Sequence, residues 1–83
     1  MIKCKFKIVS KTKREGYDQV NKCSAPSYSI EAQVVYTGSP ENEQYFLATP
    51  GGKLDLMVMN KRAADQIEPG DEVYITIEKA NKD

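Results

Sequence analysis

Period-two alternation of apolar and polar residues is the feature that most constrains the fold of this chain. In the segment IKCKFKI, residues 2–8, apolar side chains occupy every second position and lysines occupy the positions between them. Residues 28–37, 53–59 and 72–78 alternate in the same way. Because successive side chains of a strand point to opposite faces, each segment predicts a half-buried β-strand. The chain is therefore expected to be mostly β.

A turn and a further strand are expected after the first segment. The sequence KREGYD predicts a turn around Gly16, since glycine commonly marks turns. Residues 19–24 are then expected to return as a second strand. Asn21 and Pro26 are unfavourable for that strand, and proline in particular donates no hydrogen bond to a ladder.

A first short helix is expected before the segment 53–59. Ser39 is a preferred N-cap residue, and Pro40 suits the first helical position. The helix is predicted over residues 40–48, because Thr49 precedes a proline and so avoids the helical conformation. Residues 49–52 read Thr-Pro-Gly-Gly and predict a type II turn, with glycine at its third position.

A second short helix is expected before the last strand. Asn60 is its predicted N-cap, and it covers residues 61–67. Residues 68–71 read Glu-Pro-Gly-Asp and predict another type II turn. The side chains that this helix is expected to bury are Ala63, Ala64 and Ile67.

The order of these elements predicts the fold class. Five strands with a helix between the third and fourth, and a short helix before the fifth, follow the order of an OB-fold barrel. An SH3-like roll and an open sheet crossed by a helix fit the same order. We predict a single domain over residues 1–83, a small five-stranded antiparallel barrel or roll.

The charges are separated along the chain. Residues 1–22 carry seven Lys/Arg and two Asp/Glu, and residues 23–83 carry five and ten, so the halves have net charges of +5 and −5. Such blocks can pair within the fold, pair between subunits or present one basic face to an anion. Because the total charge is zero, a protein that coats nucleic acid by charge alone is not favoured.

The lysines of the first predicted strand are a candidate nucleic-acid face. Lys3, Lys5 and Lys7 share its outer side and could follow a phosphate backbone. Single-strand binders of the OB type also stack bases on aromatic side chains, and this side has none. The alternative is an exposed face whose lysines discourage edge-to-edge pairing of strands.

Nothing in the sequence favours catalysis. The chain has no His, the commonest general acid or base, and neither a G-x-S-x-G motif nor a Walker phosphate loop. Cys4 and Cys23 lack metal-ligand spacing and are expected to be reduced thiols, with a disulfide as the alternative. We predict no enzyme, no metal and no cofactor.

Two helix segments supply a candidate ligand site. Lys61 and Arg62 follow a helix start, where free backbone N–H groups suit a phosphate. Tyr45 or Phe46 of the first helix would then stack on a base. The alternative is that both segments are ordinary capped helices.

Met57 and Met59 make the strand at residues 53–59 apolar on both faces. Such a strand is either covered by a helix or placed at an interface. The first helix is the candidate cover, and subunit association is the other reading. A homo-oligomer is expected, because a small core gains stability from association.

No apolar run is long enough to span a membrane, and no signal-peptide core follows Met1. We therefore expect a cytoplasmic protein without a membrane partner.

The C-terminal half resembles a group of small uncharacterised proteins from tailed bacteriophages. Their pattern joins S-P-E-N, an aromatic residue, T-P-x-G, an alternating strand ending in Asn, an Ala-containing helix and P-G-x-E-x-Y. The matching positions are Ser39, Pro40, Glu41, Asn42, Phe46, Thr49, Pro50, Gly52, Asn60, Ala63, Pro69, Gly70, Glu72 and Tyr74. The resemblance implies a phage-encoded accessory protein that works in the host cytoplasm or in the particle.

These observations predict a non-catalytic binding module of phage type. Its concrete form is a counter-defence protein that sequesters a small nucleotide-like signalling molecule at a subunit interface, by analogy of fold and source. One alternative is an OB-type single-stranded nucleic-acid-binding protein. The other is a virion or assembly component that uses Met57 and Met59 at an interface.

Overall fold

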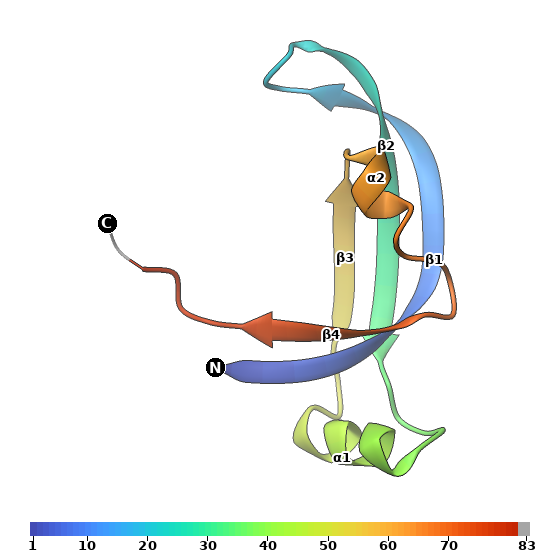
Figure 1. The fold of residues 1–83 in the computed structure, drawn as a ribbon, viewed down its shortest axis with the longest axis vertical. Coiled ribbons are helices and arrows are strands. Elements are labelled where there is room, and N and C mark those ends of the chain that lie inside the picture. The colour runs from blue at the N-terminus through green and yellow to red at the C-terminus, as the bar shows by residue number, and fades with distance from the viewer. Residues whose placement is uncertain (82–83) are drawn as a thin grey trace.

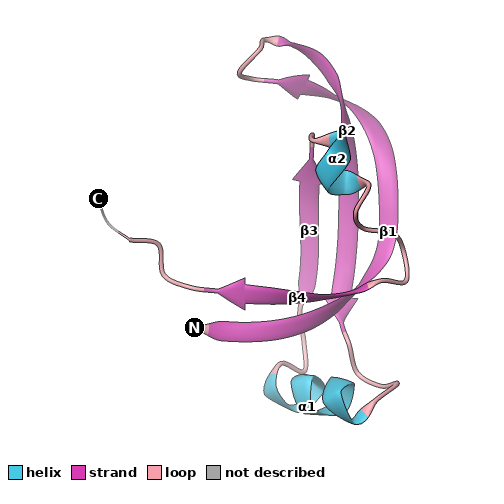
Figure 2. Cartoon of the chain, viewed as in Figure 1, coloured by secondary structure: helices cyan, strands magenta, loops and turns pink. Residues whose placement is uncertain are grey.

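The computed structural model describes residues 1–81, which form one β-sheet and two short helices (Figures 1 and 2). The strands are β1 (Ile2–Asp18), β2 (Cys23–Val34), β3 (Lys53–Val58) and β4 (Glu72–Ile77). The helices are α1 (Pro40–Ala48), between β2 and β3, and α2 (Lys61–Ala64), between β3 and β4. All neighbouring strands are antiparallel, in the order β3-β2-β1-β4. The expectation of a mostly β chain is confirmed.

The prediction of a five-stranded barrel or roll with OB-like order is wrong. The described residues form a single four-stranded sheet whose edges are β3 and β4. A closed barrel removes its edges by hydrogen-bonding them, and in this sheet β3 and β4 lie at opposite ends of the strand order.

The strand count is wrong because Gly16 lies within a strand rather than in a turn. β1 continues through Gly16, which pairs with Ala25 of β2. A Cβ at Gly16 would lie 3.0 Å from the Cβ of Ser27. Here the missing side chain allows two strands to approach closely, which is the other common use of glycine in a sheet. Residues 19–24 therefore form no separate strand, and β2 begins at Cys23.

The hairpin turn lies two residues beyond Gly16. The Asp18 carboxylate accepts hydrogen bonds from the backbone N–H groups of Val20 and Asn21, at 2.9 and 3.0 Å. Lys22 adopts a left-handed conformation, with φ of 53°. Asp and Asn form such turns through their own side chains.

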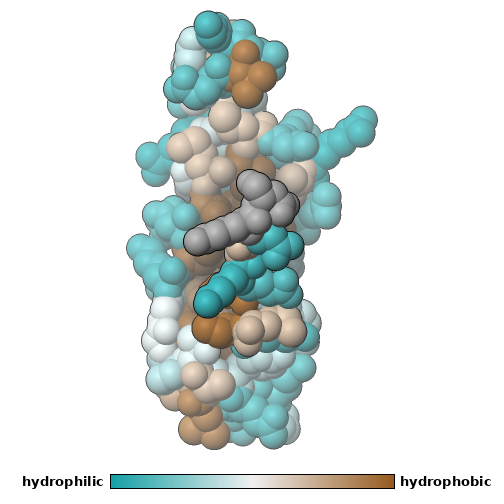
Figure 3. All heavy atoms as spheres, turned by 90° about the vertical axis from the view of Figure 1, so that its left-hand side faces the viewer, coloured by the Kyte–Doolittle hydropathy of each residue, from teal (hydrophilic) through white to brown (hydrophobic). Residues whose placement is uncertain are grey.

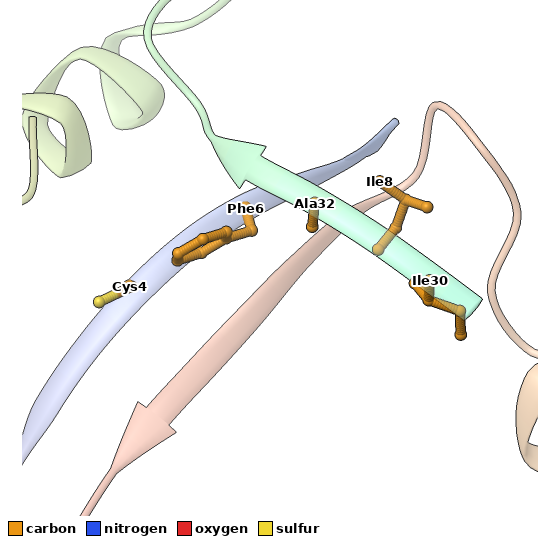
Figure 4. Close-up of a cluster of buried hydrophobic side chains, with 5 residues drawn as sticks. All are labelled: Cys4, Phe6, Ile8, Ile30 and Ala32. Atoms are coloured by element: carbon orange, nitrogen blue, oxygen red, sulfur yellow. The ribbon is translucent and has the colours of Figure 1, made fainter. Parts of the chain in front are cut away.

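The core forms where the sheet folds back across itself. The first half of β1, paired with β4, crosses β2 in Figure 4, and the register shifts between Ile8 and Ser10. A shift of this kind bends a strand. The buried cluster is Cys4, Phe6, Ile8, Ile30 and Ala32. Half-buried side chains packed against it are Val34, Leu54, Val58, Ile67, Val73 and Ile75.

The helix α1 confirms the predicted range of residues 40–48. The Ser39 hydroxyl accepts a hydrogen bond from the Asn42 backbone N–H at 3.1 Å, as an N-cap does. The turn predicted at residues 49–52 is not of type II, because Gly51 does not have a positive φ and Gly52 does. At Glu68–Asp71 the prediction agrees with the structure: Gly70 has a φ of 98°, and the Asp71 N–H donates to the Glu68 carbonyl.

The helix α2 is shorter than predicted and ends at Ala64. Asn60 caps it, accepting from the N–H groups of Arg62 and Ala63. Ala64 is buried, whereas Ala63 is exposed. A single turn directs only a narrow stripe of side chains to the sheet, so one alanine of the pair remains outside.

Candidate functional site

The free edge of β3 carries exposed apolar side chains. We define the β3 edge as Leu56 and Met57 of the strand and Met59 just after it, whose exposed fractions are 48%, 67% and 37%. Leu56 lies opposite Ile30 of β2 and so faces the core side of the sheet. Met57 lies opposite Ser29 and faces the outer side. An edge strand that is apolar on both faces is a typical association surface.

The expectation that α1 covers Met57 and Met59 is wrong. In Figure 1, α1 lies beyond the end of the sheet where β3 begins, and it packs against β1. The helix α2 packs against β2 and β3 but leaves Met57 exposed. A helix cannot cover the middle of a strand from beyond its end. The other reading, an interface, remains a prediction.

The molecule as a whole also exposes more surface than its size requires. Its accessible surface is 6471 Å², whereas a compact monomer of this mass exposes about 5,000 Å². Its radius of gyration is 15.0 Å, against about 12 Å for a compact domain of this length. Apolar residues reach the surface along the middle of the side shown in Figure 3. The missing burial is therefore apolar in part.

The charge of the basic stripe, by which we mean Lys3, Lys5 and Lys7 of β1, is partly neutralised within the fold. Lys5 is only 8% exposed, and its ammonium lies 2.6 Å from a Glu41 oxygen and 3.3 Å from a Glu72 oxygen. The Tyr74 hydroxyl donates to Glu41, and the Asn42 amide donates to Glu72. We call these five residues the Lys5 network. It joins α1 to the outer side of β1 and β4.

Ionisation in the Lys5 network follows from these contacts. The hydrogen bond from Lys5 holds the pKa of Glu41 below its ordinary value, and Tyr74 adds to this effect. Hydrogen bonds from Asn42 and then Lys5 lower the pKa of Glu72. The bond to Glu41 raises the pKa of Lys5. All three groups are therefore held in their charged forms.

Because Lys5 is paired, the basic stripe offers fewer free lysines to a nucleic acid than the sequence suggests. Of Lys3, Lys5 and Lys7, only Lys3 and Lys7 are exposed. The Lys3 ammonium lies 4.8 Å from the centre of the Tyr74 ring. Lys5 is buried between carboxylates, so it would attract a phosphate poorly. The two charge blocks of the sequence thus pair within the chain at this point.

Lys11, another lysine of the basic residues 1–22, also forms contacts within the fold. The Lys11 ammonium donates to the backbone carbonyls of Ala64 and Ile67, at 3.0 and 3.1 Å. It also lies 2.9 Å from a Glu68 carboxylate oxygen. The Ala64 carbonyl ends α2, where a cation is favourable, and the Ile67 carbonyl lies in the turn that follows. Lys11 therefore fastens α2 to the sheet.

The four residues of the candidate ligand site do not come together within one chain. Lys61 and Arg62 lie on α2, whereas Tyr45 and Phe46 lie on α1, at opposite ends of β3 (Figure 1). The Lys61 ammonium pairs with Asp65 at 2.7 Å. The sequence could not reveal this separation, because the intervening strand sets it.

The aromatic residues of α1 have partners of their own. The Tyr45 ring lies 6.0 Å from that of Tyr74, and the Phe46 ring lies edge-on to that of Tyr36 at 6.5 Å. Tyr36 is exposed and lies in the loop after β2, which ends at Val34. The Tyr45–Tyr74 pair holds α1 against the outer side of β4, and the Phe46–Tyr36 pair holds it to this loop.

Beside these rings lies a cleft that sequence patterns did not reveal. We call it the outer cleft; its volume is about 260 Å³. Its polar lining offers an ammonium, an amide, a phenol and a carboxylate. The lining residues are Lys7, Val9, Gln33, Val34, Val35, Tyr36, Thr37 and Glu72. Three segments far apart in the sequence form it, so only the tertiary structure could show it.

Other kinds of site have little basis in the described part of the chain. Within residues 1–81, no group of three or more Cys, Asp or Glu side chains is placed to hold a metal ion. Both cysteines are free thiols, Cys4 buried and Cys23 exposed. Over the same range, no helix has the length and apolar character needed to cross a membrane. No known protein family, curated protein or solved structure matches this chain.

Proposed function

We propose that this chain is a non-catalytic binding module that works through protein–protein contact. The observation that carries the proposal is the β3 edge, where Leu56, Met57 and the adjacent Met59 are exposed beside a strand with no outer neighbour in the described sheet. Exposed apolar surface of this kind is the usual mark of a protein interaction site. The resemblance of the C-terminal half to phage proteins points to an accessory or assembly role in an infected cell.

Affinity purification after cross-linking in the cell tests this proposal. The tagged chain is compared with Met57→Glu, which adds a negative charge to the β3 edge, and with Thr76→Glu, which adds the same charge to the outer face of β4. We expect the wild type and Thr76→Glu to retain a stoichiometric protein partner, and Met57→Glu to lose most of it. Equal recovery with all three chains, or no partner with any, contradicts the proposal.

A second candidate is the capture of a small nucleotide-like molecule, and the outer cleft favours it. The exposed Tyr36 ring offers a stacking surface, and Lys7 lines the same cleft and offers a cation. A cleft of about 260 Å³ is slightly smaller than the usual ligand site, which limits it to a small molecule. The same module could therefore hold a ligand on its outer side while its β3 edge holds a protein.

Thermal shift with a nucleotide panel, followed by native mass spectrometry, tests ligand capture. If a compound binds at the outer cleft, it should raise the melting temperature of the wild type. Tyr36→Ala should lower the affinity for that compound by at least about tenfold. The matched control is Tyr17→Ala, an exposed tyrosine on the β1–β2 hairpin. A clean apo spectrum and no shift across the panel contradict this candidate.

A further inference from the structure

We infer that the partner of the β3 edge is a second copy of this chain, and that the two β3 strands pair antiparallel about a two-fold axis. The inference rests on the proposed function, since it names the protein that the edge binds. The result is a continuous sheet in which the two four-stranded halves meet at β3.

The first step is that the C-terminal part of β3 lacks the usual protection of an edge strand. Natural edges are blocked by charged side chains, by proline, by bulges or by a covering element. β3 reads KLDLMV, so its charges lie only at Lys53 and Asp55; it has no proline, and it pairs with β2 through an unbroken register. Residues 56–59, which continue one position past β3, are all apolar, and three of these four side chains are exposed. An exposed apolar run is unfavourable unless it is used.

The other edge of the sheet is protected. On the outer side of β4, Tyr74 is hydrogen-bonded to Glu41 of α1 and packs beside Tyr45. The remaining outer residues of β4, Glu72 and Thr76, are polar. Besides Tyr74, the large apolar side chain that β4 exposes is Ile77, whereas the β3 edge exposes three. This difference assigns the pairing to β3.

The second step is that the chain leaves surface unburied that a homodimer could cover. The whole chain exposes about 1,500 Å² more than a compact monomer would, and the β3 edge contributes part of this excess, together with the exposed β1–β2 hairpin. A standard interface buries about 800 Å² from each partner, and obligate interfaces bury more. The net charge of zero gives no long-range repulsion between two copies. A closed two-fold dimer is also the commonest way for a small chain to complete its burial.

The third step fixes the register. Facing residues of antiparallel strands share a side of the sheet, so the axis passes beside one residue and its copy. An axis at Asp55 would place two carboxylates opposite each other, which is unfavourable. An axis at Leu54 or at Met57 would shorten the paired stretch within Lys53–Val58.

The remaining register has its axis at Leu56. It places Leu56 opposite its copy and Leu54 opposite Val58 on the core side. On the outer side, Met57 lies opposite Asp55 of the partner. This register pairs residues 54–58 of each strand and continues the apolar core face across the axis.

Disulfide trapping tests both the pairing and its register. In a Cys23→Ser background, which removes the exposed native thiol, Leu56→Cys places two thiols opposite each other at the axis. Facing positions lie within the Cα spacing that a disulfide accepts. We expect at least about tenfold more cross-linked dimer under mild oxidation than with Thr76→Cys, a matched position on β4. Cross-linking no greater than for Thr76→Cys overturns the register.

Light scattering completes the test without relying on one variant. We expect the wild type to have twice the 9.3 kDa mass of one chain, Thr76→Glu to keep that mass, and Met57→Glu to approach the mass of one chain, because the added carboxylate would lie opposite Asp55 of the partner. Circular dichroism of Met57→Glu should match the wild type, since this side chain is exposed. A wild-type chain that remains a monomer overturns the inference. If Met57→Glu then still loses a different protein from cells, the proposed function stands; if it loses none, both fail.

Discussion

Two glycines in Pro-Gly pairs show how much a single residue depends on its context. Gly70 has a φ of 98°, which only glycine adopts easily, and no atom outside its neighbours lies within 4 Å of a Cβ built there. Gly51 also has open space around it but does not have a positive φ. The two pairs look alike in the sequence, yet they make different demands on the glycine.

Alanine substitutions at these glycines should have opposite effects. Gly70→Ala should lower the free energy of unfolding by about 1–3 kcal/mol, because alanine is strained at this φ. Gly51→Ala should leave it unchanged or raise it by about 0.4–1 kcal/mol, by restricting the unfolded chain. Urea denaturation at one protein concentration measures both. Equal effects would contradict the assignment of the turn to Gly70.

Ile30 is one of the two largest fully buried side chains of the small core, the other being Ile8. It packs in the cluster with Phe6 and Ile8. Ile30→Ala should cost about 2–5 kcal/mol, from lost burial and the cavity left behind. Val20→Ala, in the exposed hairpin turn, should change stability by no more than about 0.5 kcal/mol. Chemical denaturation measures both changes. Equal shifts of the two denaturation midpoints from that of the wild type would refute the role of Ile30.

At the scale of elements, the Lys5 network decides how α1 attaches to the sheet. The folded-state pKa values of Glu41 and Glu72 lie below the ordinary value of 4.5, so their contribution is present above that pH. It is lost as the pH falls through the folded-state values. The pKa of Lys5 is raised above 10.5, so its contribution is lost only as the pH rises through its folded-state value.

Attachment of α1 should therefore be retained between about pH 5 and pH 10 and weaken outside that window. The ring signals of Tyr45 and Tyr74, followed by NMR across the pH range, report it. In Lys5→Met the acid transition should shift to higher pH, since the two carboxylates lose their cation. Lys7→Met, which removes an exposed lysine on the same face, is the control. Identical titrations of the two variants would contradict the role of Lys5.

At the scale of the whole molecule, stability should depend on protein concentration. A dimer that buries the β3 edge is favoured by mass action, so its melting temperature rises with protomer concentration. Over about a hundredfold range we expect a rise of at least about 5 °C for the wild type. Calorimetry should find a much smaller dependence for Met57→Glu, whose added carboxylate would lie opposite Asp55 of the partner. A wild-type melting temperature independent of concentration would argue against association through this edge.

Some features of the fold could be predicted because they depend on neighbouring residues. Ser39 and Pro40 begin α1, and Thr49 ends it, through backbone conformations that these residues prefer. The alternation in residues 2–8 and 53–58 predicts strands, since each side chain's direction follows from the one before it. The apolar character of Met57 and Met59 on the outer side was visible for the same reason.

Other features depend on residues far apart in the chain, and only the tertiary structure decided them. Gly16 reads as a turn until Ser27 is found packed against it, and Lys5 reads as exposed until Glu41 and Glu72 are found around it. The sheet closes into a barrel only if its two edge strands hydrogen-bond to each other. Which strands pair is decided by the relative stability of alternative long-range pairings. The alternation of residues specifies which side of each strand is buried. It does not specify the neighbour, because any strand with a matching apolar face satisfies the same pattern.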